Sequence, residues 1–463
     1  MLFNSQVFLI VFLPIILVGY YLVSANRAYR IWFLIIGSFV FYGYWDIRLV
    51  PLLAGSIALN WTLANAHRRW PQLPLILLGI SANLLVIGIF KYANFASDSI
   101  AWFLGAEQQR WSIVLPLGIS FFTFQQISYL VDTARGVSRR YRFEEYALYV
   151  CFFPQLIAGP IVRHNELIFQ FDRNPKHRDL YENLSRGAIL LVIGLVKKVL
   201  VADQLALVAD PLFAVAGLGN SLGVVDAWIA SIAFGLQIYF DFSGYSDMAI
   251  GLALMLGLHL PVNFNAPYRA LSVREFWRRW HLTLSRFLRD YVFISVGGSR
   301  AGSTRHMMAL IITMLLGGLW HGAGWNFVVW GGMHGIALAV NHLWTRAGGK
   351  LGRLPAWLAT MSFIFTTWVF FRAESFSAAV THIWSMVGSG IGVAGDNGVN
   401  VVDVAWLFSV AALIALVGPT SQEIAREHVV SKPALAALGA LAMAAVFLQV
   451  GGGTNAEFIY FQF

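Results

Sequence analysis

The stretch LIITMLLGGLWHGAGW at residues 310–325 decides how this chain is built. It is a long apolar run with one ionisable residue, His321, set between the pair Gly317-Gly318 and Gly322. Ionisable residues at membrane depth are costly and tend to be placed for function. A second histidine, His281, ends the upstream string REFWRRWH. Together the two histidines predict chemistry inside a lipid bilayer.

The composition extends this prediction to the whole chain. The 463 residues are 58% hydrophobic and 12% charged, with a mean hydropathy of +0.67, whereas a soluble domain carries about 25% charged residues. The apolar runs have about the twenty-residue length of membrane helices and lack the alternation of barrel strands. The net charge of +9 comes from basic residues in short loops, which suits anionic headgroups and disfavours nucleic-acid binding.

The apolar runs predict an all-α polytopic membrane protein that forms one membrane-embedded domain over residues 1–463. We expect roughly eleven transmembrane helices, together with re-entrant and interfacial ones, because several runs are short or interrupted by Gly and Pro. The predicted helical spans are 7–23, 31–44, 49–66, 73–90, 113–131, 146–161, 187–208, 227–258, 307–319, 325–343, 356–371, 402–417 and 434–450. The longest polar connection, 263–306, carries apolar residues at helical spacing from Phe276 to Tyr291 and many arginines. That pattern predicts an amphipathic helix lying at the membrane interface.

The sequence supports different interpretations of the two histidines. His321 lies among glycines that let the backbone approach a ligand closely, so its imidazole is a candidate general base. The alternative is a buried histidine that hydrogen-bonds a neighbouring helix, and the sequence leaves the two interpretations balanced. His281 borders the apolar stripe of its segment, and its spacing alone favours an ordinary interfacial histidine.

Several other polar residues lie inside apolar runs. Asp241, Ser243 and Asp247 follow one another along the span at 227–258, and they form either a polar cavity wall or a network that ties helices together. Lys197 and Lys198 are expected either to snorkel or to pair with an acidic residue such as Asp203, in a structural role. Cys151 is the single cysteine, so an intrachain disulfide is excluded. We expect no metal site, and the nucleophile elbow and the phosphate-loop lysine pattern are both missing.

Five strings of the sequence resemble the membrane-bound O-acyltransferase family, and most closely its branch that acetylates bacterial exopolysaccharides such as alginate. They are FFPQLIAGPI at 152–161, QIYFDFSGYSD at 237–247, NFNAPY at 263–268, REFWRRWHLTLS at 274–285 and LGGLWHGAGW at 316–325. The resemblance implies that His321 is the catalytic residue and His281 a second active-site residue, both in a tunnel through the membrane domain. Trp320, Asp241, Asn265 and Ser243 are the expected substrate-binding residues.

The resemblance also implies a reaction and its partners. We expect transfer of acetyl groups from a cytoplasmic donor, acetyl-CoA, across the bacterial inner membrane, with no bound cofactor. A periplasmic SGNH-like acetyltransferase and other exopolysaccharide acetylation proteins would complete the transfer, most simply onto alginate. Acetylation of cellulose or peptidoglycan and D-alanylation of teichoic acid are alternatives with the same histidines. A transporter of lipid-linked sugars and a secretion scaffold are alternatives that need no chemistry at His321.

Overall fold

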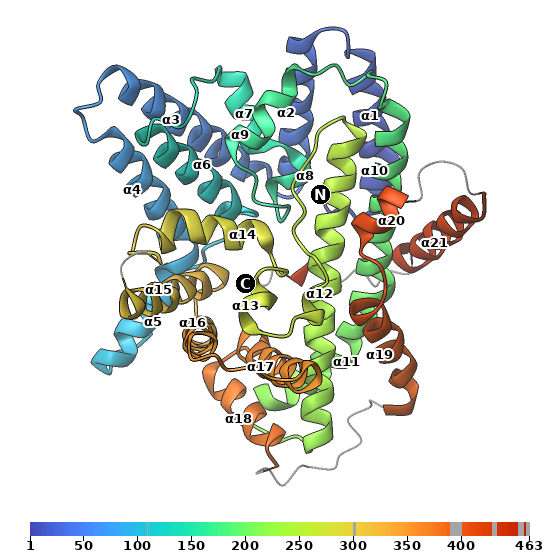
Figure 1. The fold of residues 1–463 in the computed structure, drawn as a ribbon. Coiled ribbons are helices and arrows are strands. Elements are labelled where there is room, and N and C mark those ends of the chain that lie inside the picture. The colour runs from blue at the N-terminus through green and yellow to red at the C-terminus, as the bar shows by residue number, and fades with distance from the viewer. Residues whose placement is uncertain (109, 300–301, 389–400, 428–432, 452–457, 460–463) are drawn as a thin grey trace. The chain divides into compact units, whose positions relative to one another are not determined.

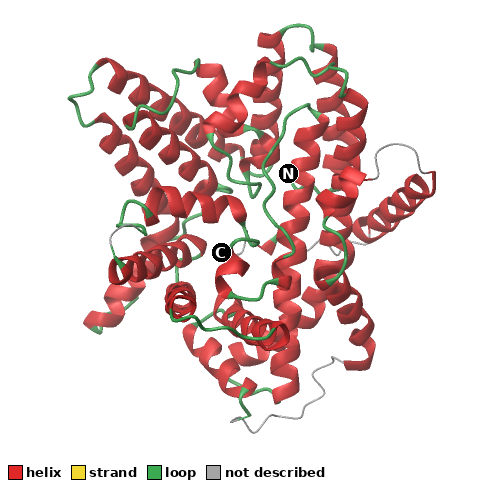
Figure 2. Ribbon diagram, viewed as in Figure 1, coloured by secondary structure: helices red, strands yellow, loops and turns green. Residues whose placement is uncertain are grey.

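The computed structural model describes residues 1–108, 110–299, 302–388, 401–427, 433–451 and 458–459 (Figure 1). Within these ranges the chain forms helices and loops, and no strand occurs (Figure 2). The expected all-α fold is therefore confirmed. The chain divides into two compact units, and the helix α12 (Val224–Met255) contributes to both. The prediction of one functional domain over the whole chain stays a prediction.

Unit 1 comprises Met1–Leu195, Tyr245–Val262 and Ser421–Thr454. Its helices beside α12 are η1 (Val7–Phe12), α1 (Leu13–Leu22), α2 (Arg27–Gly43), η2 (Ile47–Leu49), α3 (Val50–Arg69), α4 (Leu75–Ile87), η3 (Gly88–Tyr92), α5 (Ala93–Leu104), α6 (Ile119–Ala134), α7 (Phe143–Cys151), α8 (Phe153–Leu156), α9 (His164–Leu167), η4 (Ile168–Asp172), α10 (Leu180–Leu195), α20 (Ser421–Glu427) and α21 (Pro433–Gly451). The span expected at 146–161 is interrupted at Phe152, because Pro154 lacks the N–H that would continue α7 and its ring would clash with the carbonyl four residues earlier.

Unit 2 comprises Val196–Gly244, Asn263–Thr420 and Asn455–Phe463. Its helices beside α12 are η5 (Val196–Ala202), α11 (Asp203–Gly217), η6 (Pro267–Arg269), α13 (Val273–Trp277), α14 (Leu282–Phe287), η7 (Leu288–Phe293), α15 (Ser303–His321), α16 (Trp325–Arg346), α17 (Arg353–Arg372), α18 (Phe376–Met386) and α19 (Val401–Leu416). The candidate catalytic residues belong to this unit.

Helices α15 and α16 form a tightly packed hairpin. A Cβ added at Gly318 of α15 would overlap the carbonyl oxygen of Phe327, and one added at Gly331 of α16 would overlap that of Met314. Small residues at such positions let two membrane helices approach closely. The hairpin turns at Gly322, directly after His321, so the close packing fixes the end of the helix that carries this histidine.

The continuous interfacial helix expected from Phe276 to Tyr291 is interrupted in the structure. It breaks between α13 and α14, where His281 adopts a left-handed backbone with φ of 42°. Phe276 and Trp280 are buried and stack on each other with ring centroids 5.5 Å apart. The sequence pattern identified the apolar face correctly, but that face packs against protein. The contacts among its large buried aromatic rings stabilise the interrupted conformation.

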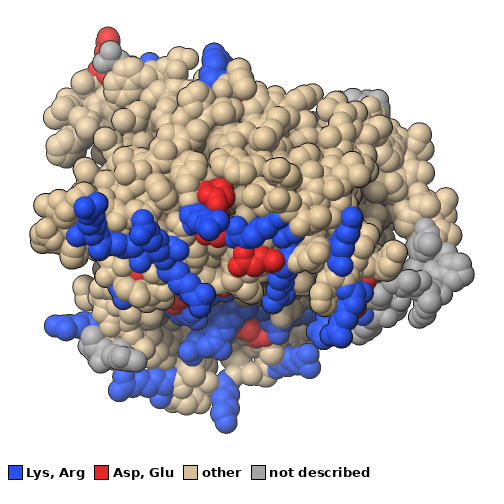
Figure 3. Space-filling model, turned by 90° about the horizontal axis from the view of Figure 1, so that it is seen from above, with Lys and Arg blue, Asp and Glu red and all other residues tan. Residues whose placement is uncertain are grey.

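Four helices among the described residues are long and apolar enough to cross a membrane. They are Ile47–Arg69, Leu75–Leu104, Val224–Met255 and Arg353–Arg372. Exposed Lys and Arg side chains gather on the face shown in Figure 3, with few acidic side chains among them. The chain is thus a polytopic membrane protein, while the number of crossings stays a prediction.

Candidate active site

His321 is the last residue of α15 and is almost fully buried, with 3% of its surface exposed. Three aromatic rings surround its imidazole: Trp320 at 4.8 Å, Trp330 at 5.2 Å and Phe371 at 5.3 Å between centroids. The rings of Trp330 and Phe371 stand edge-on to it. The imidazole therefore has a fixed position in surroundings of low polarity, where electrostatic effects are stronger than in water.

His281 is fully buried and is held by Asn263. Its Nδ1 lies 3.0 Å from the Asn263 side-chain oxygen, which also accepts hydrogen bonds from the backbone N–H and the hydroxyl of Thr283. An oxygen that accepts from Thr283 also accepts from the imidazole, so Nδ1 carries the proton and Nε2 presents a lone pair. No described residue hydrogen-bonds that Nε2. His281 is thus a neutral imidazole with its basic nitrogen available.

Burial explains why this ring stays neutral. Loss of hydration lowers the pKa of His281 to about 3, because the charged imidazolium is disfavoured away from water. Its left-handed backbone adds strain of a kind that clusters at functional sites. The interfacial interpretation favoured by spacing alone is wrong for this residue, since its ring lies inside the protein.

Trp320 brings the two histidines into one neighbourhood. Its indole ring lies 6.1 Å from the His281 ring and 4.8 Å from the His321 ring, and its own exposure is 5%. The His281 ring also meets Phe242 of α12 edge-on at 4.7 Å. The structure therefore gathers both predicted catalytic histidines around one of the predicted substrate-binding residues.

Asp241 belongs to a buried ion cluster. Lys198 Nζ lies 2.7 Å from an Asp241 oxygen and 2.8 Å from an Asp203 oxygen, and the backbone N–H of Ile459 donates to the other Asp241 oxygen at 2.7 Å. All three charged side chains are at most 10% exposed. The expected pairing of Lys198 with Asp203 is present. Asp241 is tied into a network of charges, as the structural alternative for it supposed.

The remaining predicted residues lie in different surroundings. Ser243 is buried in α12, and its hydroxyl has no hydrogen-bond partner among the described residues, so it can bind a polar ligand group. Asn265 is exposed, and its backbone N–H donates to Arg279. Asp247 accepts a hydrogen bond from Ser421 at 2.6 Å within unit 1. The prediction that Asn265, Trp320, Asp241 and Ser243 bind substrate stays a prediction.

Sequence reasoning did not single out two residues of this site. Asn263 occurs in the same sequence string as Asn265. Its role becomes visible only in the structure, where its side chain contacts His281. His334 of α16 accepts a hydrogen bond from the Trp277 indole at Nδ1, 3.2 Å away, and its Nε2 lies 3.1 Å from the Thr367 hydroxyl. Both of its nitrogens are occupied, so His334 is a structural histidine. His334 lies outside the five strings that carry the family resemblance, whereas His321 lies within one of them.

Neither a metal centre nor a tunnel is among the described features of the site. Over the residues that the structure describes, no three His, Cys, Asp or Glu side chains gather as metal ligands. The pocket described in unit 2 is lined by other residues than the two histidines. The tunnel implied by the family resemblance therefore stays a prediction.

Comparison with known proteins gives this site its context. Residues 74–379 match the family model for the membrane-bound O-acyltransferase family. The chain is 41% identical to a peptidoglycan O-acetyltransferase of Helicobacter pylori, over 84% of this chain and 80% of the relative. It is also 41% identical to a probable alginate O-acetylase AlgI of Pseudomonas aeruginosa, over 82% of this chain and 73% of the relative.

A more distant relative has a different printed activity. A teichoic acid D-alanyltransferase of Streptococcus thermophilus is 30% identical, over 50% of this chain and 57% of the relative. The family match covers most of α4 to α18, including both candidate histidines. The chain therefore belongs to the membrane-bound O-acyltransferase family and is an O-acyltransferase.

Proposed function

We propose that this protein transfers acetyl groups from a cytoplasmic donor, acetyl-CoA, for the O-acetylation of an extracytoplasmic polysaccharide. The observation that carries the proposal is the pair of buried histidines, His281 and His321, on either side of Trp320. The similarity to two O-acetyltransferases over more than four fifths of the chain supports acetyl as the group transferred. The D-alanyltransferase resembles a smaller part of it.

The geometry suits a proton transfer between an acceptor hydroxyl and a leaving thiolate. The hydroxyl oxygen attacks the carbonyl carbon of the acetyl thioester, a C–O bond forms, and the C–S bond breaks. His321 takes the hydroxyl proton and returns it to the thiolate of coenzyme A. The lone pair of His281 Nε2 accepts a hydrogen bond from a second hydroxyl of the acceptor and so orients the acceptor. General-base assistance of this kind contributes about 10²–10⁴-fold.

For the polysaccharide, alginate is our first candidate and peptidoglycan the second, because relatives of both kinds match this chain at 41% identity. We further propose that the protein resides in the bacterial inner membrane. In this scheme a separate periplasmic SGNH-like acetyltransferase receives the acetyl group and passes it to sugar, together with other exopolysaccharide acetylation proteins.

Reconstitution tests these steps. The full chain is inserted into liposomes and supplied with acetyl-CoA labelled in the acetyl group, and alginate oligosaccharides or muropeptides are offered with and without a periplasmic acetyltransferase. We expect label on one class of acceptor only when the periplasmic protein is present. Labelling without that protein would contradict the relay. A D-alanyl carrier protein that serves as donor in place of acetyl-CoA would contradict acetyl transfer.

A further inference from the structure

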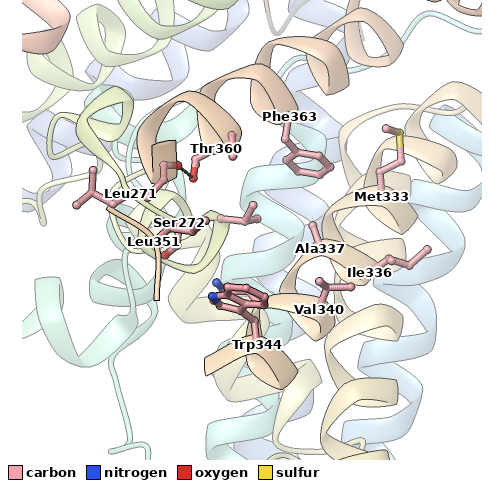
Figure 4. Close-up of a pocket in the computed structure, with 14 residues that line it drawn as sticks. Leu271, Ser272, Met333, Ile336, Ala337, Val340, Trp344, Leu351, Thr360 and Phe363 are labelled. Atoms are coloured by element: carbon pink, nitrogen blue, oxygen red, sulfur yellow. Dashed lines mark hydrogen bonds between the residues drawn. The ribbon is translucent and has the colours of Figure 1, made fainter. Parts of the chain in front are cut away.

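Unit 2 contains a pocket of about 710 Å³ between α16, α17 and the segment just before α13 (Figure 4). Its lining residues are Leu271, Ser272, Val273, Met333, Ile336, Ala337, Val340, Asn341, Trp344, Leu351, Ala356, Ala359, Thr360 and Phe363. The volume falls in the range of small-molecule sites. Since neither His281 nor His321 lines it, the pocket needs an explanation of its own.

The interior of this pocket suits a hydrocarbon chain. Most lining side chains are apolar, and two of the polar ones are already engaged within the protein. The Ser272 hydroxyl accepts the backbone N–H of Glu275 at the start of α13, and the Thr360 hydroxyl donates to the carbonyl of Ala356. Away from the Asn341 amide and the Trp344 indole, a polar ligand group would leave its own hydrogen bonds unmade against the apolar walls, which is costly.

The pocket also opens on a surface that suits lipid. Ile336, Val340 and Trp344 of α16 line it, and yet 56%, 58% and 49% of their surfaces are exposed. The opposite wall belongs to α17, one of the helices long and apolar enough to cross a membrane. Apolar side chains exposed beside a membrane-crossing helix contact acyl chains, so the pocket is within reach of a bilayer lipid.

Positive charge gathers at one end of the pocket. Trp344 and Leu351 line that end, where α16 runs into α17, and the exposed side chains of Arg346, Lys350 and Arg353 lie within two residues of them. Residues 291–373 contain no Asp or Glu, so this part of the sequence offers no carboxylate to neutralise them. Basic residues beside a membrane helix attract anionic headgroups.

We propose that this pocket binds an anionic phospholipid of the surrounding bilayer. An acyl chain lies between α16 and α17, and the phosphate contacts the cations of the α16–α17 connection, Arg346, Lys350 and Arg353. The site is separate from the acetyl-transfer site, so lipid binding here does not depend on which group the enzyme transfers. Each cation near an anionic membrane surface contributes about a fivefold gain in affinity, so three contribute about a hundredfold.

Native mass spectrometry of the full chain in detergent tests the proposal. Phosphatidylglycerol and phosphatidylcholine with identical acyl chains are titrated separately, and the bound fraction is measured. We expect phosphatidylglycerol to bind about a hundredfold more tightly. The triple variant Arg346→Gln, Lys350→Gln, Arg353→Gln should lose this preference, while Ala337→Phe, which fills the pocket, should lose both lipids.

Two controls keep the result specific. The variant Arg139→Gln, Arg140→Gln, Lys176→Gln removes the same number of exposed cations from unit 1 and should keep the preference. Leu343→Phe enlarges an exposed side chain of α16 outside the lining and should keep both lipids. An equal loss in either control, or an unchanged lipid preference in the triple variant, would overturn the proposal. The proposal would also be overturned if the protein formed a dimer that Ala337→Phe dissociates, because the pocket would then bind a second copy of the chain.

Discussion

The side-chain oxygen of Asn263 lies 3.0 Å from His281 Nδ1 and determines which nitrogen of that imidazole carries the proton. The same oxygen accepts two hydrogen bonds from Thr283, so the amide cannot turn around without losing them. Partners of this kind, one layer behind a functional histidine, fix its tautomer and its ring orientation. The arrangement makes Asn263 a positioning residue for His281.

Replacing Asn263 should therefore impair catalysis without removing a catalytic group. We expect Asn263→Ala to lower the turnover of acetyl-CoA in proteoliposomes by about 10–100-fold, with a smaller change in KM. Asn265→Ala is the matched control, because that residue is exposed in the same segment. If both variants lost activity equally, the effect would belong to the segment and not to the hydrogen bond.

His321 should be indispensable for turnover. We expect His321→Ala to lower kcat by about 10²–10⁴-fold while the protein still elutes as a single folded species. His382→Gln is the control, because His382 is also buried in unit 2 and its Nε2 lies 3.0 Å from the Ala227 carbonyl oxygen. It should keep most of the activity. Full activity of His321→Ala would remove this residue from the mechanism and favour a transporter or a scaffold.

The buried ion cluster should be a large contributor to stability. Lys198→Met leaves the buried carboxylates of Asp203 and Asp241 without this cation in an apolar interior, and we expect a loss of about 3–5 kcal/mol in the free energy of unfolding. Asp210→Asn removes a pair with Arg372 in which the carboxylate is 52% exposed, and should cost about 0–1 kcal/mol. Thermal unfolding in detergent compares the two. Similar losses would show that burial does not decide the outcome.

The close packing of α15 on α16 should not tolerate a single methyl group. Gly318→Ala places a Cβ against the carbonyl of Phe327, so we expect a lower unfolding temperature and lower activity. Gly55→Ala in α3 is the control, since a Cβ there meets nothing within 4 Å. It should be neutral or stabilising by about 0.5–1 kcal/mol. A stable, active Gly318→Ala would mean that the hairpin can separate without affecting His321.

The depressed pKa of His281 predicts how stability depends on pH. The folded protein binds no proton at this ring until about pH 3, whereas the unfolded chain binds one below its ordinary pKa of 6.5. Unfolding is therefore favoured as the pH falls from 6.5 towards 3, and the unfolding temperature should decline over that range. His281→Gln should reduce the slope. A slope that the substitution leaves unchanged would place the titration at another group.

The sequence predicted the helical architecture well, because apolar runs recur along the whole chain even where Gly and Pro interrupt them. It offered the pair Lys198–Asp203 as the alternative to snorkelling for a physical reason: a buried ammonium needs a carboxylate within reach. It did not predict the break at His281, because a helical apolar stripe looks the same whether it faces lipid or protein. The burial of Phe276 and Trp280 appears only in three dimensions.

The site could be predicted in part. His321 and Trp320 are adjacent in sequence, so their proximity needed no structure. The contact of His281 with Asn263 spans 18 residues that include η6 and α13, and periodicity carries no information about such a fold-back. The exposure of Asn265, two positions later, follows from the same fold-back. Short helices such as α18 were missed because they lack the length of a membrane span.

The hydrogen bond from Ile459 to Asp241 has a consequence for how the protein is made. The two residues are 218 positions apart, so the ribosome adds this length of chain after Asp241 before the acceptor can meet its donor. Lys198 precedes Asp241 and can neutralise it early, while the second oxygen of Asp241 meets its donor only after Ile459 has been added. The cluster of Lys198, Asp203 and Asp241 therefore gains its last hydrogen bond late, after the helices around it have been inserted.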